Sequence, residues 1–192
     1  QSGLLMQKIG VIGAGTMGNG IAQTFAMAGH PVVLQDLSEA ALLKARSTIE
    51  GSLARLAKKE RITPDAAEQT LALIRTTTEL GPLESSDLVV EAIVENIEIK
   101  ANVLGRLDTL CSAETIFASN TSSISLTRLA AASSRPERVI GMHFFNPVPM
   151  MKLVEIIRAL QTSDAVCERI TELTRQIGKT PHVSKDSYGF VV

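Results

Sequence analysis

Short apolar runs alternate with longer amphipathic stretches along most of this chain. The apolar runs are rich in Val, Ile and Leu and stop at Gly or polar residues, which is typical of buried strands. Strands are therefore predicted over residues 8–12, 31–35, 88–90, 115–118, 138–141 and 180–183.

The stretches between these runs carry the start and stop signals of helices. Ser38 and Ser163 are suited to cap helix N-termini, and Pro64 suits a first helical turn. Gly29 and Gly178 stand where left-handed C-terminal caps are common. Strands that alternate with helices predict an α/β fold whose parallel sheet is covered on both faces. Helices are predicted over residues 16–28, 39–59, from 64 onward, 97–110, 126–132 and 164–177.

Length and composition fit one globular domain. The chain has 192 residues, and we assign 6–192 to this domain and 1–5 to a remnant of recombinant expression. A net charge of −1 and only 3% aromatic residues argue against nucleic acid as a main partner. The only cysteines, Cys111 and Cys167, fit no metal-site or disulfide spacing, which favours a reducing, cytoplasmic location. No apolar run approaches the roughly 18 residues that span a membrane.

The strongest single motif is a glycine-rich turn between the first predicted strand and the first helix. Its outer glycines would allow a tight turn and close helix packing, and the middle one would let the backbone approach a pyrophosphate. The following helix N-terminus offers free N–H groups to phosphates. A glycine-rich turn without a ligand is the alternative interpretation. The motif consists of Gly13, Ala14, Gly15, Thr16, Met17 and Gly18.

Asp36 at the end of the second predicted strand strengthens the cofactor interpretation. A carboxylate roughly 20 residues after the motif is where the adenosine ribose is bound in dinucleotide domains. It would repel a 2′-phosphate, and no Arg follows within a few residues to accommodate one. We therefore predict NAD as the cofactor and a Rossmann-type, doubly wound, mostly parallel sheet.

Polar residues follow two further predicted strands. The loop from Asn120 to Ser123 follows the strand ending at 118, and His143 follows the strand at 138–141. Ligands bind at the carboxyl ends of strands in such sheets, and a histidine there can transfer a proton near neutral pH. Glu155 is a candidate partner for the imidazole, although a spacing of twelve does not prove contact. Helix capping by the serines and a structural histidine remain alternatives. A hydrolase triad is disfavoured because no G-x-S-x-G elbow is present.

Taken together, these motifs resemble the NAD-binding domain of the 3-hydroxyacyl-CoA dehydrogenases, close to the bacterial 3-hydroxybutyryl-CoA dehydrogenases. The resemblance extends over nearly the whole chain and combines several motifs. The matching segments are IGVIGAGTMG at 9–18, EAIVEN at 91–96, ASNTSS at 118–123, GMHFFNP at 141–147 and MKLVE at 151–155.

This resemblance implies an oxidoreductase that transfers a hydride between NAD(H) and a short-chain (S)-3-hydroxyacyl-CoA. It implies that His143 is the general acid/base, Glu155 its carboxylate partner, and Ser122 a donor to the substrate oxygen. No metal site is implied. Two further sets are implied as binding residues: Glu95, Lys100 and Asn146 at the cofactor, and Ser52 and Lys59 at coenzyme A. A solvated helix face is the alternative for the last pair.

The family pattern continues beyond Val192 into an Asn-Arg pair and a helical C-terminal domain, which is absent from this chain. The chain therefore looks cut at this point, and we expect a homodimer to form through the absent domain. Tyr188 replaces a proline common in the family. Two other classes stay open: a non-catalytic NAD(H)-binding module, and a related hydroxyacid dehydrogenase that does not use coenzyme A.

Overall fold

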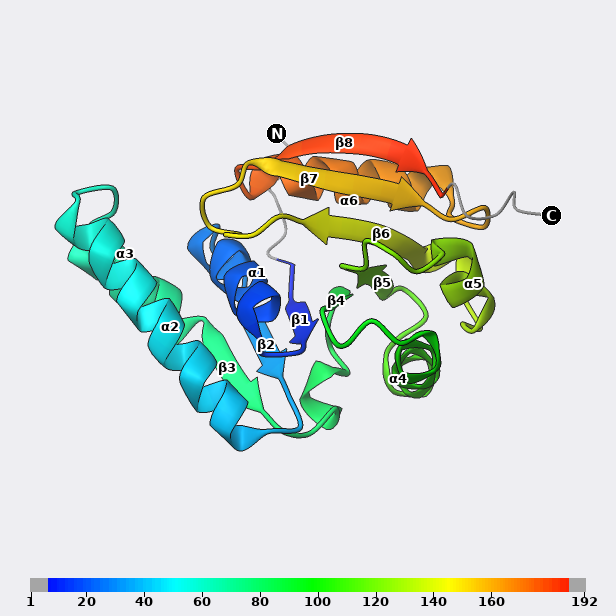
Figure 1. The fold of residues 1–192 in the computed structure, drawn as a ribbon, viewed down its shortest axis with the longest axis horizontal. Coiled ribbons are helices and arrows are strands. Elements are labelled where there is room, and N and C mark those ends of the chain that lie inside the picture. Colours follow the sequence, from blue (N-terminus) through cyan, green and yellow to red (C-terminus); the bar gives the residue numbers. More distant parts are fainter. Residues whose placement is uncertain (1–6, 187–192) are drawn as a thin grey trace.

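An eight-stranded sheet in the order β3-β2-β1-β4-β5-β6-β7-β8 forms the centre of the computed structural model (Figure 1). The strands from β3 to β6 are parallel, β7 runs antiparallel to β6, and β8 is parallel to β7. This confirms the predicted α/β class with a mostly parallel sheet. The strands are β1 (Ile9–Ile12), β2 (Val32–Gln35), β3 (Ile74–Thr77), β4 (Leu88–Glu91), β5 (Ile116–Ser119), β6 (Val139–Phe144), β7 (Leu153–Arg158) and β8 (Thr180–Lys185).

The structure describes residues 7–186. The predicted expression remnant at 1–5, Tyr188 and the terminal run at 189–192 lie outside the described residues, so the domain bounds 6–192 stay a prediction.

The predicted helices all form, Ser38 and Ser163 cap them as expected, and Thr63 is a further cap that was not predicted. The hydroxyls of Ser38, Thr63 and Ser163 accept hydrogen bonds from backbone N–H groups of the first helical turns. The helices are α1 (Thr16–Met27), α2 (Glu39–Lys58), α3 (Pro64–Ala72), α4 (Ile97–Leu110), α5 (Leu126–Ala131) and α6 (Asp164–Gln176), with 3₁₀ turns η1 (Gly81–Leu83) and η2 (Pro136–Arg138).

Each central strand alternates its apolar side chains between two separate cores. In β4, for example, Val90 packs with residues of α1, α2 and α6, whereas Val89 packs with residues of α4 and α5. This period of two places helices on both faces of the sheet, as Figure 1 shows. The doubly wound architecture is therefore confirmed.

Two strands were not predicted, and both lie toward the ends of the sheet. β3 reads Ile-Arg-Thr-Thr and buries only Ile74, so it lacks the apolar run that marks a strand. β7 follows a proline-containing loop and begins at an exposed Leu153, after which buried and half-buried positions alternate. This short, partly exposed pattern gives a weak strand signal. Both strands are held by neighbours distant in sequence, which a local pattern does not contain.

Candidate functional site

A crevice opens where the winding of the sheet reverses, between β1 and β4. The chain goes from β1 through α1 to β2 on one side, and from β4 through α4 to β5 on the other (Figure 1). The connections that follow these two strands therefore run in opposite directions, and dinucleotides bind at such switch points. Most of the predicted site residues follow the ends of β1, β2, β4, β5 and β6.

The glycine-rich turn has the geometry that a phosphate site needs. Gly13 has a φ of 99°, and a Cβ at Gly18 would overlap the Gly13 carbonyl. A Cβ at Gly15, by contrast, would meet nothing within 4 Å. The outer glycines are thus required by the protein itself, whereas the space at Gly15 is open to a ligand. Gly15 is also the N-cap of α1, where no side chain caps the free N–H groups.

Gly18→Ala is expected to lower the free energy of unfolding by about 2–3 kcal/mol, because the methyl group meets backbone that cannot rotate away. Thermal denaturation should show this as a Tm lower by about 5–10 °C. Gly105→Ala in α4 is the matched control, since a Cβ there meets nothing within 4 Å. It should raise stability by up to about 1 kcal/mol. Equal Tm values for the two variants would contradict this account of the turn.

Asp36 lies beside this turn and already organises its backbone. One carboxylate oxygen accepts the Ala14 N–H at 2.8 Å, and the other accepts the Ser38 N–H at 2.8 Å. A cavity of about 750 Å³ extends from here along the edge of the sheet. Its lining includes Gly13, Gly15, Asp36, Leu37, Val94 and Ile99. The rest of the lining is mixed, since Glu79 adds a second carboxylate and Arg106 a guanidinium to a largely apolar wall. A wall of this kind suits the adenosine half of NAD.

A second cavity, of about 340 Å³, continues from the first, and both are lined by Ala92 and Ile93. It brings together predicted site residues from four separate segments of the chain. Those that line it are Met17, Glu95, Lys100, Ser122, His143 and Asn146. The structure therefore brings together residues assigned to the cofactor and residues assigned to catalysis, which the sequence alone did not show.

His143 and Glu155 meet across the antiparallel pair of β6 and β7. The two residues are directly opposite in the strand register, and His143 Nδ1 lies 3.2 Å from Glu155 Oε2. An ionised carboxylate only accepts hydrogen bonds, so Nδ1 carries the proton in this contact. Nε2 then keeps its lone pair. The fold thus places the two side chains in contact, and β7, the strand we did not predict, creates this contact.

The Ser122 loop is tied to the strand that carries His143. The Asn120 side-chain oxygen accepts the Phe144 backbone N–H at 2.8 Å. Ser122 itself is exposed and lines the second cavity, as does His143. Because this hydrogen bond links the end of β5 to β6, it fixes the serine loop relative to the histidine.

Lys100 lies in a buried network of charged side chains, and sequence reasoning missed its main partner, Glu91. The ammonium lies 2.8 Å from both oxygens of Glu91 and 3.2 Å from Glu95. Burial works against ionisation of Glu95, but hydrogen bonds from Ser123 and Thr121 and the Lys100 charge outweigh it, so the pKa of Glu95 is lowered. Glu91 could have been noticed from its place at the end of a strand within the EAIVEN segment.

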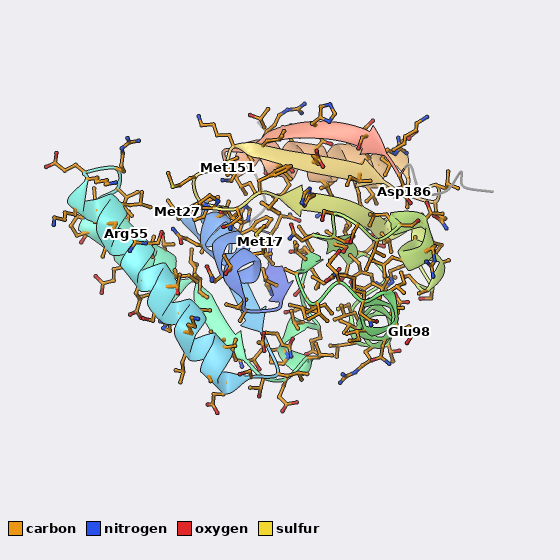
Figure 2. The ribbon with its side chains drawn as sticks, in the orientation of Figure 1. Met17, Met27, Arg55, Glu98, Met151 and Asp186 are labelled. Carbon is orange, nitrogen blue, oxygen red and sulfur yellow. The ribbon has the colours of Figure 1, made fainter. Side chains whose placement is uncertain are left out.

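Neither predicted coenzyme A residue lines these two cavities. Ser52 is half-buried on α2 and accepts a hydrogen bond from the Gln23 amide of α1 at 2.9 Å. Lys59 is exposed at the end of α2. Figure 2 labels Arg55 on the same helix, with Met17 and Met27 on the neighbouring α1. The pair thus lies along α2, outside the lining of the cavity that holds His143.

Within residues 7–186, no helix is long and apolar enough to cross a membrane. No group of three or more His, Cys, Asp or Glu side chains in that range is arranged to hold a metal ion. Cys111 and Cys167 are both free and buried.

Comparison with known proteins agrees with this geometry. Residues 8–187 match the family described as "3-hydroxyacyl-CoA dehydrogenase, NAD binding domain". The 3-hydroxybutyryl-CoA dehydrogenase of Bradyrhizobium diazoefficiens is 47% identical over 188 residues, which cover 98% of this chain and 64% of that protein. The crystal structure of (S)-3-hydroxybutyryl-CoA dehydrogenase from Ralstonia eutropha has a TM-score of 0.93 and 49% identity, and the match covers 98% of this chain and 66% of that one. The chain thus spans slightly less than two thirds of these relatives.

Proposed function

Because the chain belongs to the 3-hydroxyacyl-CoA dehydrogenase family through its NAD-binding domain, we propose that the protein interconverts short-chain (S)-3-hydroxyacyl-CoA and 3-ketoacyl-CoA. The observation that carries this proposal is the shared cavity: the His143–Glu155 pair opens onto the space lined by Met17, Glu95 and Lys100. A proton-transfer group beside a dinucleotide crevice is what a hydride-transfer enzyme needs.

The chemistry divides between the cofactor and the side chains. NAD, when bound, accepts the hydride that leaves C3 of the substrate. His143 Nε2 takes the proton of the C3 hydroxyl as the carbonyl forms, and Glu155 stabilises the resulting imidazolium. Ser122 donates to the same substrate oxygen. In the reverse direction the imidazolium returns the proton to the carbonyl oxygen.

The glycine-rich turn and Asp36 would hold the other half of the cofactor. The free N–H groups at the start of α1 would bind the pyrophosphate, and the open space at Gly15 would admit it. Asp36 would accept the ribose hydroxyls and repel a 2′-phosphate. Lys100, Glu95 and Asn146 line the cavity that would receive the nicotinamide.

Asp36→Asn is expected to narrow the preference for NADH over NADPH by about tenfold. Asparagine keeps an oxygen for the Ala14 N–H but removes the charge that repels a phosphate. Calorimetric titration with both cofactors measures the ratio of their Kd values. Asp87→Asn is the control. Asp87 also accepts a backbone N–H, that of Lys8 at 2.7 Å, but it lies at the amino ends of the strands, away from the cofactor crevice. An unchanged ratio for Asp36→Asn would overturn the assignment.

The coenzyme A part would extend along α2. Ser52 lies on this helix and Lys59 caps its C-terminus. Arg55 and Lys58 lie between them, so the last turn of the helix is basic. Cationic side chains suit the phosphates of coenzyme A. The predicted homodimer, the helical domain that would form it and the cytoplasmic location rest on the family resemblance and on composition, and they stay predictions.

The deciding experiment follows NADH consumption with acetoacetyl-CoA, using this chain and the full product of its gene. Turnover of acetoacetyl-CoA, with little of free acetoacetate, supports the proposal. Equal turnover of the free acid would indicate a hydroxyacid dehydrogenase. NADH binding without turnover of either compound by the full product would indicate a binding module and refute the proposed activity.

A further inference from the structure

Glu91 is a buried carboxylate to which the proposed reaction gives no part. It ends β4 and is paired in register with Ile12 of β1 and Ser119 of β5, so it stands at the switch point of the sheet. It is only 8% exposed. Glutamate is almost never this buried unless its charge is paired, so Glu91 requires charged or hydrogen-bonding partners inside the protein.

The contacts of Glu91 are all to protein groups that bear on the site. Lys100 Nζ lies 2.8 Å from each carboxylate oxygen. The Ser119 hydroxyl donates to Oε1, and the Ile93 N–H donates to Oε2 at 3.1 Å. Each oxygen thus accepts a charged and a neutral donor, so the carboxylate has little freedom to rotate.

Lys100 is held from several sides, and Glu91 is its closest partner. Its side chain is 0% exposed, and its ammonium also contacts Glu95 at 3.2 Å and the Ile93 carbonyl at 3.3 Å. Glu95 is less firmly placed, because 44% of its side chain is exposed. The buried carboxylate therefore determines where the charge of Lys100 stands in the cavity wall.

The network closes on the loop that carries Ser122. Glu95 Oε2 accepts the hydroxyls of Thr121 and Ser123, each at 2.6 Å. On the other side of the loop, the Thr121 N–H donates to Ser119 Oγ at 3.2 Å, and Ser119 donates to Glu91. Two routes thus lead from Glu91 to the residues on either side of Ser122.

We propose that Glu91 is a positioning residue of this site. Its carboxylate fixes Lys100 directly, and through Lys100 and Ser119 it fixes the Ser122 loop, in the geometry that receives the nicotinamide end of NAD(H). The inference rests on the proposed function for the identity of that ligand. It assigns Glu91 no contact with the cofactor or the substrate.

Glu91→Gln isolates the role of the charge. Glutamine has nearly the same volume, but it keeps one acceptor oxygen and turns an amide donor toward the Lys100 ammonium. Lys100 is then left with Glu95 as its only carboxylate partner. The stronger attraction between them should draw Glu95 away from Thr121 and Ser123, so the Ser122 loop and the cavity wall both shift.

The test is a double-mutant cycle on NADH affinity, measured by calorimetry with Glu91→Gln, Lys100→Gln and the variant carrying both changes. We expect Glu91→Gln to raise the Kd for NADH by about tenfold or more. The oxygen that glutamine keeps can still accept the Ser119 hydroxyl, so the effect of Glu91→Gln runs through Lys100, and the double variant should bind no more weakly than Lys100→Gln alone. NADH binding by Glu91→Gln within twofold of the wild type would overturn the proposal.

The control is Asp108→Asn, which breaks another buried ion pair, between Arg135 and Asp108, with side chains 11% and 9% exposed. Both variants break a buried ion pair, so both should lower Tm. Asp108→Asn should nevertheless leave the Kd for NADH within twofold of the wild type. An equal affinity loss in this control would reveal a merely structural effect and refute the inference. If Glu91→Gln does not fold, the double variant is compared with Lys100→Gln alone. A Kd for NADH a further tenfold higher in the double variant overturns the inference about Glu91.

These measurements separate this inference from the proposed reaction. NADH binding by the wild type and its variants tests Glu91 whether or not acetoacetyl-CoA is turned over. Absence of turnover in the full gene product would refute the proposed activity while leaving the binding cycle interpretable.

Discussion

His143→Gln is expected to lower kcat for acetoacetyl-CoA reduction by about 10³-fold, within the range that a lost general acid/base costs. The amide of glutamine neither accepts nor releases a proton near neutral pH, so the substrate oxygen must exchange its proton with water. The Kd for NADH should stay within a few-fold of the wild type, because the phosphate turn and Asp36 are untouched. Steady-state kinetics and calorimetry on the same preparation measure both quantities.

His182→Gln is the matched control for this variant. His182 is the register partner of Glu155 on β8, so it flanks the same carboxylate from the opposite strand, but it is exposed and does not line the cavity of His143. Its kcat should remain within twofold of the wild type. A kcat for His143→Gln within tenfold of the wild type would refute the role given to His143. Equal losses in both variants would point to damage to the sheet rather than to lost chemistry.

The fold class was predictable because the central strands and their helices carry local signals. β1, β4 and β5 are short apolar runs, and α2 and α6 begin at Ser38 and Ser163, whose hydroxyls form the expected caps. The glycine turn was predictable for the same reason, since its spacing reflects backbone geometry within a few residues. These features depend on neighbours in sequence and are visible without a structure.

The parts of the site that the sequence left open or missed depend on contacts between distant segments. Glu155 approaches His143 only because β7 pairs antiparallel with β6, and β7 lies behind a loop that gives no strand signal. Glu91 lies within the EAIVEN segment, yet its burial against Lys100 follows from the register of β4 with β5 and the start of α4. The chemistry of the two side chains and the family resemblance suggested the first contact, whereas the place of Glu91 at a strand end did not indicate its contact with Lys100.

Glu155→Gln is expected to lower kcat by about 10²- to 10³-fold while the Kd for NADH changes little. Glutamine at this position has two ways to meet His143 Nδ1, and both impair the imidazole. If its oxygen accepts from Nδ1, the tautomer is kept but the charge that stabilises the imidazolium is lost. If its NH₂ donates to Nδ1, the proton moves to Nε2, which then has no lone pair for the substrate proton.

A double variant distinguishes the two outcomes, and kcat of Glu155→Gln alone tests whether the His143–Glu155 pair takes part in the reaction. With the tautomer kept, kcat falls but still requires His143, so a further His143→Gln change costs more. With the tautomer reversed, the histidine is already inactive as a base, and the double variant is no slower than Glu155→Gln alone. Glu155 Oε2 lies 3.2 Å from His143 Nδ1 because the two residues are opposite in the register of β6 and β7. Glutamine does not change this backbone pairing, so the fold itself should be unaffected. A Glu155→Gln enzyme with wild-type kcat would therefore show that the pair is structural, and it would remove the observation on which the proposed function rests.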